Sequence, residues 1–209
     1  MAAALAVLIA VTGTSLSGCG MAVRSASTSL SIDETGKLRE EIVEPQGQDD
    51  FTAEELEGYI EQEIELYNRS REGAVKLNSC TVLNGEVKIS LEYASFDDYA
   101  AFNQVTCFAG TLQEAEDAGY EVERTWLEPG GTKGDMEIIR ERFREWKVFI
   151  VSEEINVKVP DKILYASENV KITGRLTAVV QSVMNEENEE TAIHPLATVA
   201  DRFAYIIYK

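Results

Sequence analysis

The side chains best suited to nucleophilic chemistry are few and widely spaced in this chain of 209 residues. The cysteines are Cys19, Cys80 and Cys107, and the single histidine is His194. A serine or cysteine nucleophile needs a base within hydrogen-bonding reach. His194 stands next to Pro195 and has no Cys or His near it in the sequence. A Cys107–His194 pair would therefore have to be assembled by the fold.

Carboxylates are abundant and offer a second kind of chemistry. A glycosidase needs two of them facing each other across a cleft, and Asp97, Asp98 and many glutamates are available. Asp98, however, is already explained as part of a helix cap that begins at Ser95. The acidic run 186–190 lacks the alternate ligand spacing and the turning glycine of a calcium loop, so it is predicted to be solvated. No metal site and no cofactor is predicted.

The glycine-rich run 130–134 contains a lysine, as phosphate-binding loops do. In those loops the lysine leads directly into Ser or Thr at the start of a helix. Here Lys133 is followed by Gly134 and Asp135, so the order does not fit. We expect a surface connection instead.

Aromatic residues provide the remaining candidate for a binding site. Tyr120, Val122, Arg124 and Trp126 alternate with polar residues, a pattern that predicts a strand. Aromatic side chains on one face of a strand either fill a core or line a groove for a sugar or peptide. Both interpretations stay open, and Tyr120 and Trp126 are the candidate ligand-binding residues.

The stretch Leu16-Ser17-Gly18-Cys19 follows a short apolar run, and residues 1–18 contain no charged side chain. The apolar run is shorter than the roughly 20 residues that a membrane-spanning helix needs. It suits the apolar part of a signal peptide. The four-residue stretch resembles the lipobox of bacterial lipoproteins, although no Lys or Arg precedes Arg24. This resemblance implies that 1–18 is a signal peptide removed before Cys19 and that the Cys19 thiol carries a diacylglycerol.

The lipobox resemblance implies a place for the protein as well. Two acyl chains anchor a protein stably, so the chain is expected to be exported and held on the outer face of a bacterial membrane through Cys19. Residues 19–29 would form the anchor and a tether that reaches about 30 Å at full extension. The acidic, Tyr-rich remainder resembles uncharacterised lipoproteins of Gram-positive bacteria in its general composition. This resemblance assigns no functional residue.

The formal net charge is −18, which constrains the partners. Such a chain is repelled by phosphate backbones, so nucleic acid is not expected as a partner. Anionic lipid headgroups would repel it too, so the lipid is expected to hold the protein without electrostatic help. Cys80 and Cys107 form an even pair in an exported domain and could make a disulfide. The alternative is two free, buried thiols.

Residues 30–209 are predicted to form a single α+β domain. We expect an antiparallel sheet of hairpins, helices mainly on one of its faces and a β-rich C-terminal lobe, with 128–136 as the candidate lobe boundary. Thr52 with Glu55, and Thr111 with Glu114, have the spacing of capping boxes, and Asn84-Gly85 favours a type I′ turn. The predicted hairpins are 30–42 and 75–93, the helices are 51–72, 95–105, 111–119 and one after Asp135, and the strands are 120–126, 147–152, 155–159, 162–167, 170–173, 176–180 and 202–208.

These features favour a non-catalytic binding or envelope-assembly module, with an envelope protein or glycan as its partner. One alternative is an envelope-acting hydrolase, which would need a cleft with two facing carboxylates or His194 beside Cys107. The other alternative is a purely structural component of an envelope complex. That role predicts an exposed apolar patch and no pocket.

Overall fold

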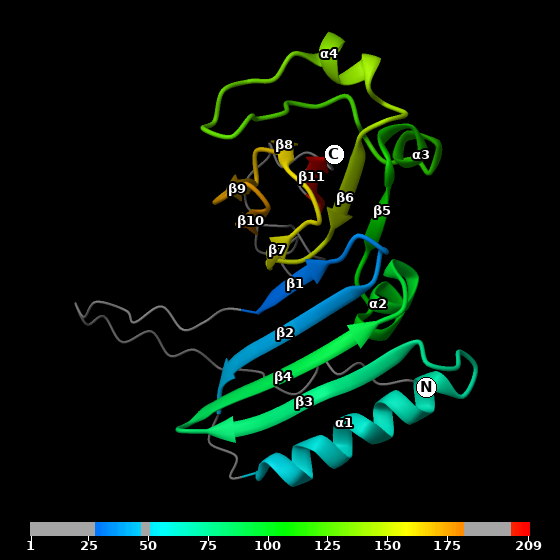
Figure 1. Cartoon of the computed structure of the whole chain (residues 1–209), viewed down its shortest axis with the longest axis vertical. Helices are drawn as coiled ribbons and strands as arrows, with labels where there is room; N and C mark the ends of the chain where they lie inside the picture. The colour runs from blue at the N-terminus through cyan, green and yellow to red at the C-terminus, as the bar shows by residue number, and fades with distance from the viewer. Residues whose placement is uncertain (1–27, 47–50, 182–201) are drawn as a thin grey trace, which may run out of the picture.

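The computed structural model describes residues 28–46, 51–181 and 202–209. These residues form an α+β fold with two mostly antiparallel sheets (Figure 1). The predicted signal peptide, Cys19, His194 and the acidic run 186–190 lie outside the described residues.

The larger sheet has seven strands in the order β3-β4-β2-β1-β7-β10-β9. Its neighbouring strands are antiparallel except for β1 and β7, which are parallel although they lie more than 120 residues apart in the chain. The predicted hairpins are both present, and Asn84 and Gly85 adopt the positive φ angles, 54° and 77°, of their turn. The strands are β1 (Ser29–Ile32), β2 (Leu38–Pro45), β3 (Val75–Leu83), β4 (Glu86–Tyr93), β7 (Asn156–Lys158), β9 (Val170–Ile172) and β10 (Thr177–Val180).

The smaller sheet has four antiparallel strands in the order β5-β6-β11-β8. They are β5 (Cys107–Thr111), β6 (Lys147–Val151), β8 (Ile163–Ala166) and β11 (Ala204–Tyr208). Every residue of β11 is buried, because its side chains alternate between the two core clusters that cover the two faces of the strand. All four strands come from the C-terminal half of the chain, which is β-rich and also supplies β7, β9 and β10 to the larger sheet.

The helices begin where capping residues predict. They are α1 (Ala53–Asn68), α2 (Phe96–Asn103), α3 (Leu112–Asp117) and α4 (Met136–Glu141). The Thr52–Glu55 and Thr111–Glu114 capping boxes are complete, each with both reciprocal hydrogen bonds. Ser95 and Asp135 cap α2 and α4 through their side-chain oxygens.

Two buried clusters hold these elements together. The larger lies against one face of the seven-stranded sheet and includes Ile60 and Ile64 of α1 and Phe102 of α2. The smaller lies against the four-stranded sheet and includes both Trp126 and Ile139. Residues on both sides of 128–136 therefore belong to the smaller cluster.

One predicted strand is wrong, and one strand was missed. Residues 120–126 form no strand, because the chain turns here: the Arg124 backbone N–H and the Trp126 indole N–H both donate to the Val122 carbonyl, each at 3.1 Å. The end of the predicted helix 95–105 is also too long, since Gln104 is left-handed and ends α2. The strand β5 follows, and pairing with β6 outweighs the weak β propensity of its Ala and Gly residues.

Candidate functional site

The face of the seven-stranded sheet opposite the core is not covered by any helix in the part of the chain that the structure describes. Both α1 and α2 pack on the other face, since their buried side chains belong to the larger core cluster. The strict alternation of strand side chains places every second residue on the uncovered face. We call this surface the open face.

A continuous row of side chains crosses the open face from strand to strand. The register pairs neighbours along it in the order Lys76, Glu92, Arg39, Ser31, Lys158 and Thr177, on β3, β4, β2, β1, β7 and β10. We call these six residues the open-face row. Three of the six are cationic and one is anionic, in a chain whose net charge is −18.

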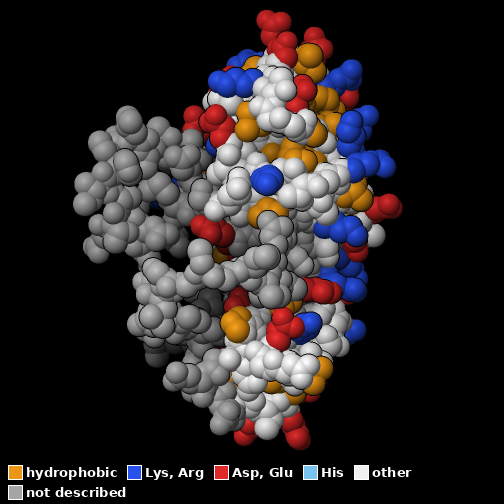
Figure 2. Space-filling view, turned by 90° about the vertical axis from the view of Figure 1, so that its left-hand side faces the viewer, with side chains coloured by type: hydrophobic (Ala, Val, Ile, Leu, Met, Phe, Trp, Pro, Cys, Tyr) orange, Lys and Arg blue, Asp and Glu red, His pale blue; other side chains and the backbone are white. Residues whose placement is uncertain are grey.

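Further cations lie beside the row. Lys88 of β4 and Lys171 of β9 lie on the same side of the sheet as the row, as the strand register shows. Lys37 directly precedes β2. The anions on the open face are Glu41, Glu86 and Glu92. Figure 2 shows Lys and Arg side chains gathered down one edge of the molecule, the side that faces the viewer in Figure 1.

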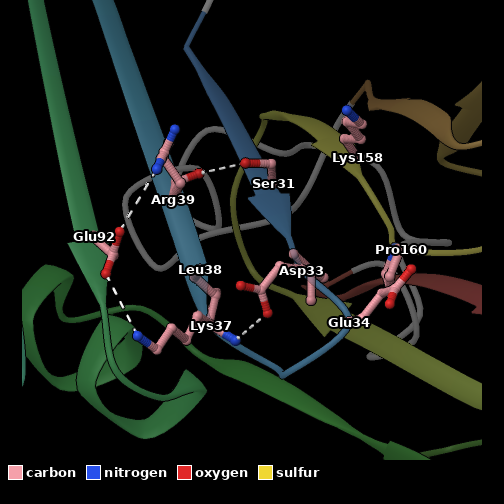
Figure 3. A pocket seen from close by; sticks show the side chains of 10 residues that line it. Ser31, Asp33, Glu34, Lys37, Leu38, Arg39, Glu92, Lys158 and Pro160 are labelled. Carbon is pink, nitrogen blue, oxygen red and sulfur yellow. Dashed lines mark hydrogen bonds and ion pairs between the residues drawn. The ribbon is translucent and has the colours of Figure 1, made fainter.

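A shallow pocket of about 370 Å³ opens at the middle of the row (Figure 3). Its walls come from β1, β2 and β4, from the turn between β1 and β2, and from the chain at the end of β7. The lining residues are Ser31, Ile32, Asp33, Glu34, Lys37, Leu38, Arg39, Glu92, Lys158 and Pro160. Most of them are polar, and cations and carboxylates are equally represented.

Charges in this pocket are only partly matched. Glu92 is shared between Lys37, at 3.8 Å, and Arg39, at 3.7 Å. The Asp33 carboxylate accepts hydrogen bonds from the backbone N–H groups of Thr35 and Lys37 and from the Thr35 hydroxyl. The Thr35 hydroxyl bond is the main cause that lowers the pKa of Asp33. Within the described residues Lys158 makes no ion pair, and its side chain is exposed.

A second pocket, of about 490 Å³, lies on the other side of the same turn. It shares Ile32, Asp33, Glu34 and Pro160 with the first pocket and extends towards Tyr208. The β1–β2 turn therefore borders both hollows.

Several strongly perturbed titratable groups lie in the interior and line neither pocket. On the core face of β2, the Glu40 side chain is 5 % exposed and accepts a hydrogen bond of 2.6 Å from the Tyr93 hydroxyl. The Asn103 amide donates to the same hydroxyl at 3.1 Å. Burial raises the pKa of Glu40 to about 7; the charge of Glu153 adds to the rise, whereas the Tyr93 hydrogen bond opposes it.

Glu153, just after β6, completes this group. It accepts a hydrogen bond from the Tyr99 hydroxyl, and burial raises its pKa while that bond opposes the rise. Burial also raises the pKa of Tyr93 and Tyr99 well above 10. Glu40 and Glu153 are both carboxylates, but they contact buried tyrosines and neither lines the pockets on the two sides of the β1–β2 turn.

No protein-family model, no curated protein and no solved structure matches this chain. Among the described residues, no helix has the length and apolar character needed to cross a membrane. The same residues contain no cluster of three or more His, Cys, Asp or Glu side chains that could hold a metal ion.

Cys80 and Cys107, the two cysteines among the described residues, are free thiols. Cys80 lies half-buried on β3, and its thiol is 3.8 Å from the Ala53 carbonyl oxygen. Cys107 is buried on β5, where burial raises the pKa of its thiol. They lie on strands of different sheets and form no disulfide in the structure. Cys19 and His194 fall outside the described residues, so neither Cys19 lipidation nor a Cys107–His194 pair can be placed.

Tyr120 and Trp126 lie together, but in the smaller core cluster. Trp126 is 1 % exposed and packs edge-on against Tyr205 with ring centroids 6.0 Å apart. Tyr120 is half-buried between Phe108 and Phe203. Neither aromatic residue lines the pockets described above, and both act as core residues.

Sequence reasoning missed the residues that define the open-face row and the buried carboxylate. A signal for Glu40 was present, because Leu38, Glu40 and Ile42 share one phase of a predicted strand whose other members are apolar. An acidic residue on the strand face whose other residues are apolar is expected to be buried. The row had no such signal, since it joins residues from six strands.

Proposed function

We propose that this chain is an exported lipoprotein, anchored through a lipid on Cys19, that works as a non-catalytic binding or assembly module on the outer face of a bacterial membrane. The proposed location rests on the lipobox resemblance. The observation that carries the binding role is the open face, which presents a cationic row and a pocket where no described helix covers the sheet.

The anchor is tested by the mass of the mature protein. We expect a chain that begins at Cys19 and carries the added mass of a diacylglycerol. A Cys19→Ala variant should remain uncut and lose the lipid. A wild-type chain that is cut elsewhere, or that carries no added lipid mass, would refute the lipid anchor.

One observation favours a rival function. Glu40 and Glu153 are two carboxylates close enough for the charge of one to act on the other, as an envelope hydrolase would require. Against this function, both contact buried tyrosine hydroxyls and neither lines a pocket that could admit a glycan.

The two functions differ in a direct assay. Soluble peptidoglycan fragments incubated with the protein should remain intact by chromatography. Products that appear with the wild-type chain and disappear with Glu40→Gln and Glu153→Gln, but persist with the exposed control Glu41→Gln, would establish the hydrolase instead.

A further inference from the structure

The charged side chains of this acidic protein are distributed unequally between two opposite sides of the seven-stranded sheet. On the core side, the helix α1 contains six glutamates and no Lys or Arg. On the other side, the open face carries five cations against three anions. The two sides therefore differ in sign, although the whole chain has a net charge of −18.

The place where the chain enters the fold lies on this same sheet. The first strand, β1, begins at Ser29, and Ser29 belongs to the open face because it pairs with Glu41 and Asn156 in the outward phase. Nine residues separate Cys19 from Ser29, and a span of this length reaches about 30 Å. A lipid on Cys19 would keep the open face within reach of the bilayer.

We propose that the open face docks on the anionic headgroups of the membrane that anchors the protein, with α1 directed away from the bilayer. This inference rests on the lipid anchor of the proposed function and names the partner of the open face.

The physical reason is the short range of electrostatic forces in salt. The Debye length is about 8 Å at physiological ionic strength, so the membrane responds to the nearest side of the protein and not to its net charge. Each Lys or Arg near an anionic surface contributes a modest attraction. A lipid-tethered protein needs only this bias, because the anchor has already supplied the binding energy and the charges merely select an orientation.

Three residues of the row make this docking specific. Lys76, Arg39 and Lys158 extend across five strands in one line, and all three are exposed. Arg39 shares Glu92 with Lys37 at distances near the limit of an ion pair, 3.7 and 3.8 Å. Such loose, solvent-exposed pairs contribute little to stability, so the cations can exchange Glu92 for lipid phosphates.

The test uses the lipidated chain bound to vesicles of phosphatidylcholine alone or of phosphatidylcholine mixed equally with phosphatidylglycerol. A water-soluble amine-acylating reagent is added, and the labelling rate of each lysine is read by peptide mass spectrometry. On the anionic vesicles, labelling of Lys76 and Lys158 should slow roughly five- to tenfold. Labelling of Lys133, on the loop 128–134, should not change, and high salt should remove the difference.

Charge-reversal variants test whether the protection from labelling depends on the cations of the open face. Lys76→Glu with Arg39→Glu should abolish the protection of Lys158. The matched control, Lys133→Glu with Arg144→Glu, changes the net charge equally on other exposed residues and should preserve it. Equal labelling on both kinds of vesicle, or protection of Lys133 in place of Lys158, would overturn the docked orientation while leaving the anchor intact. Failure to bind either vesicle would overturn the anchor and the docking together.

Discussion

The Tyr93 hydroxyl donates a hydrogen bond of 2.6 Å to the Glu40 carboxylate, in the interior of the fold. Tyr93 ends β4 and Glu40 lies on the adjacent strand β2, and both side chains point to the core. Burying an ionised carboxylate costs free energy unless partners compensate for the lost water. The Tyr93 bond compensates only in part, since the pKa of Glu40 is still raised to about 7.

Replacing Glu40 by Gln should change the pH dependence of stability. Because the folded-state pKa of Glu40 lies above 4.5, its contribution is fully present below about pH 4.5 and is lost as the pH rises through 7. Relative to wild type, Glu40→Gln should gain up to about 3 kcal/mol in the free energy of unfolding between pH 5 and pH 8. Urea unfolding at several pH values measures this difference.

The neighbouring residue offers a matched control for that experiment. Glu41 is exposed on the opposite face of the same strand, so Glu41→Gln should follow the wild-type pH profile. Parallel profiles for Glu40→Gln and wild type would show that Glu40 does not titrate in this range.

Asp98 should contribute to stability with the opposite pH dependence. Burial by itself would raise its pKa, but hydrogen bonds from Ser95, Arg71 and Tyr67 outweigh burial and lower it. In Asp98→Asn an amide N–H₂ would replace one acceptor oxygen and face these donors, which should cost about 2 kcal/mol of unfolding free energy.

The Asp98 contribution should vanish in acid. A lowered pKa gives stability that is present above the unfolded value near 3.8 and is lost as the pH falls through the folded value. The difference between Asp98→Asn and wild type should therefore shrink below about pH 4. Asp97→Asn, at the exposed neighbouring position, should change stability by less than about 0.5 kcal/mol at any pH. An equal loss in both variants would refute the proposed role of the Asp98 hydrogen bonds.

Two glycines should respond in opposite ways to alanine. A Cβ at Gly134 would lie 2.5 Å from the Tyr165 ring, and such overpacking costs about 1–3 kcal/mol. A Cβ at Gly58, inside α1, would meet nothing within 4 Å. There the change should stabilise the helix by up to about 1 kcal/mol. Thermal unfolding of both variants provides the comparison, and a stabilised Gly134→Ala would contradict the packing.

Thiol labelling should distinguish Cys80 from Cys107. Cys80 is half-buried and Cys107 is buried, and burial raises the pKa of both thiols. A thiol reagent should therefore label Cys80 slowly and Cys107 only after unfolding, since the thiolate is the reactive form. In denaturant without reductant both should label fully. Two unreactive cysteines under that condition would show a disulfide in place of free thiols.

Much of the fold could be predicted because its signals are local. The capping pairs Thr52–Glu55 and Thr111–Glu114 and the Asn84-Gly85 turn act within four residues of chain. Segment 120–126 shows the limit of such reasoning, because its alternation predicted a strand but no neighbouring strand pairs with it. Strand β5 shows the converse, since pairing with β6 produces a strand that its own residues do not favour.

The sequence by itself determined the acidic net charge of −18, the capped helices, the hairpins and the lipobox resemblance. Only the tertiary structure decided where the charges lie. The row that joins Ser31 to Lys158 depends on parallel pairing between β1 and β7, more than 120 residues apart in the chain. The burial of Glu40 likewise depends on side chains from α2 and β4. Net charge adds over residues regardless of position, whereas electrostatic attraction and burial depend on distance, and distance is set by the sheet register.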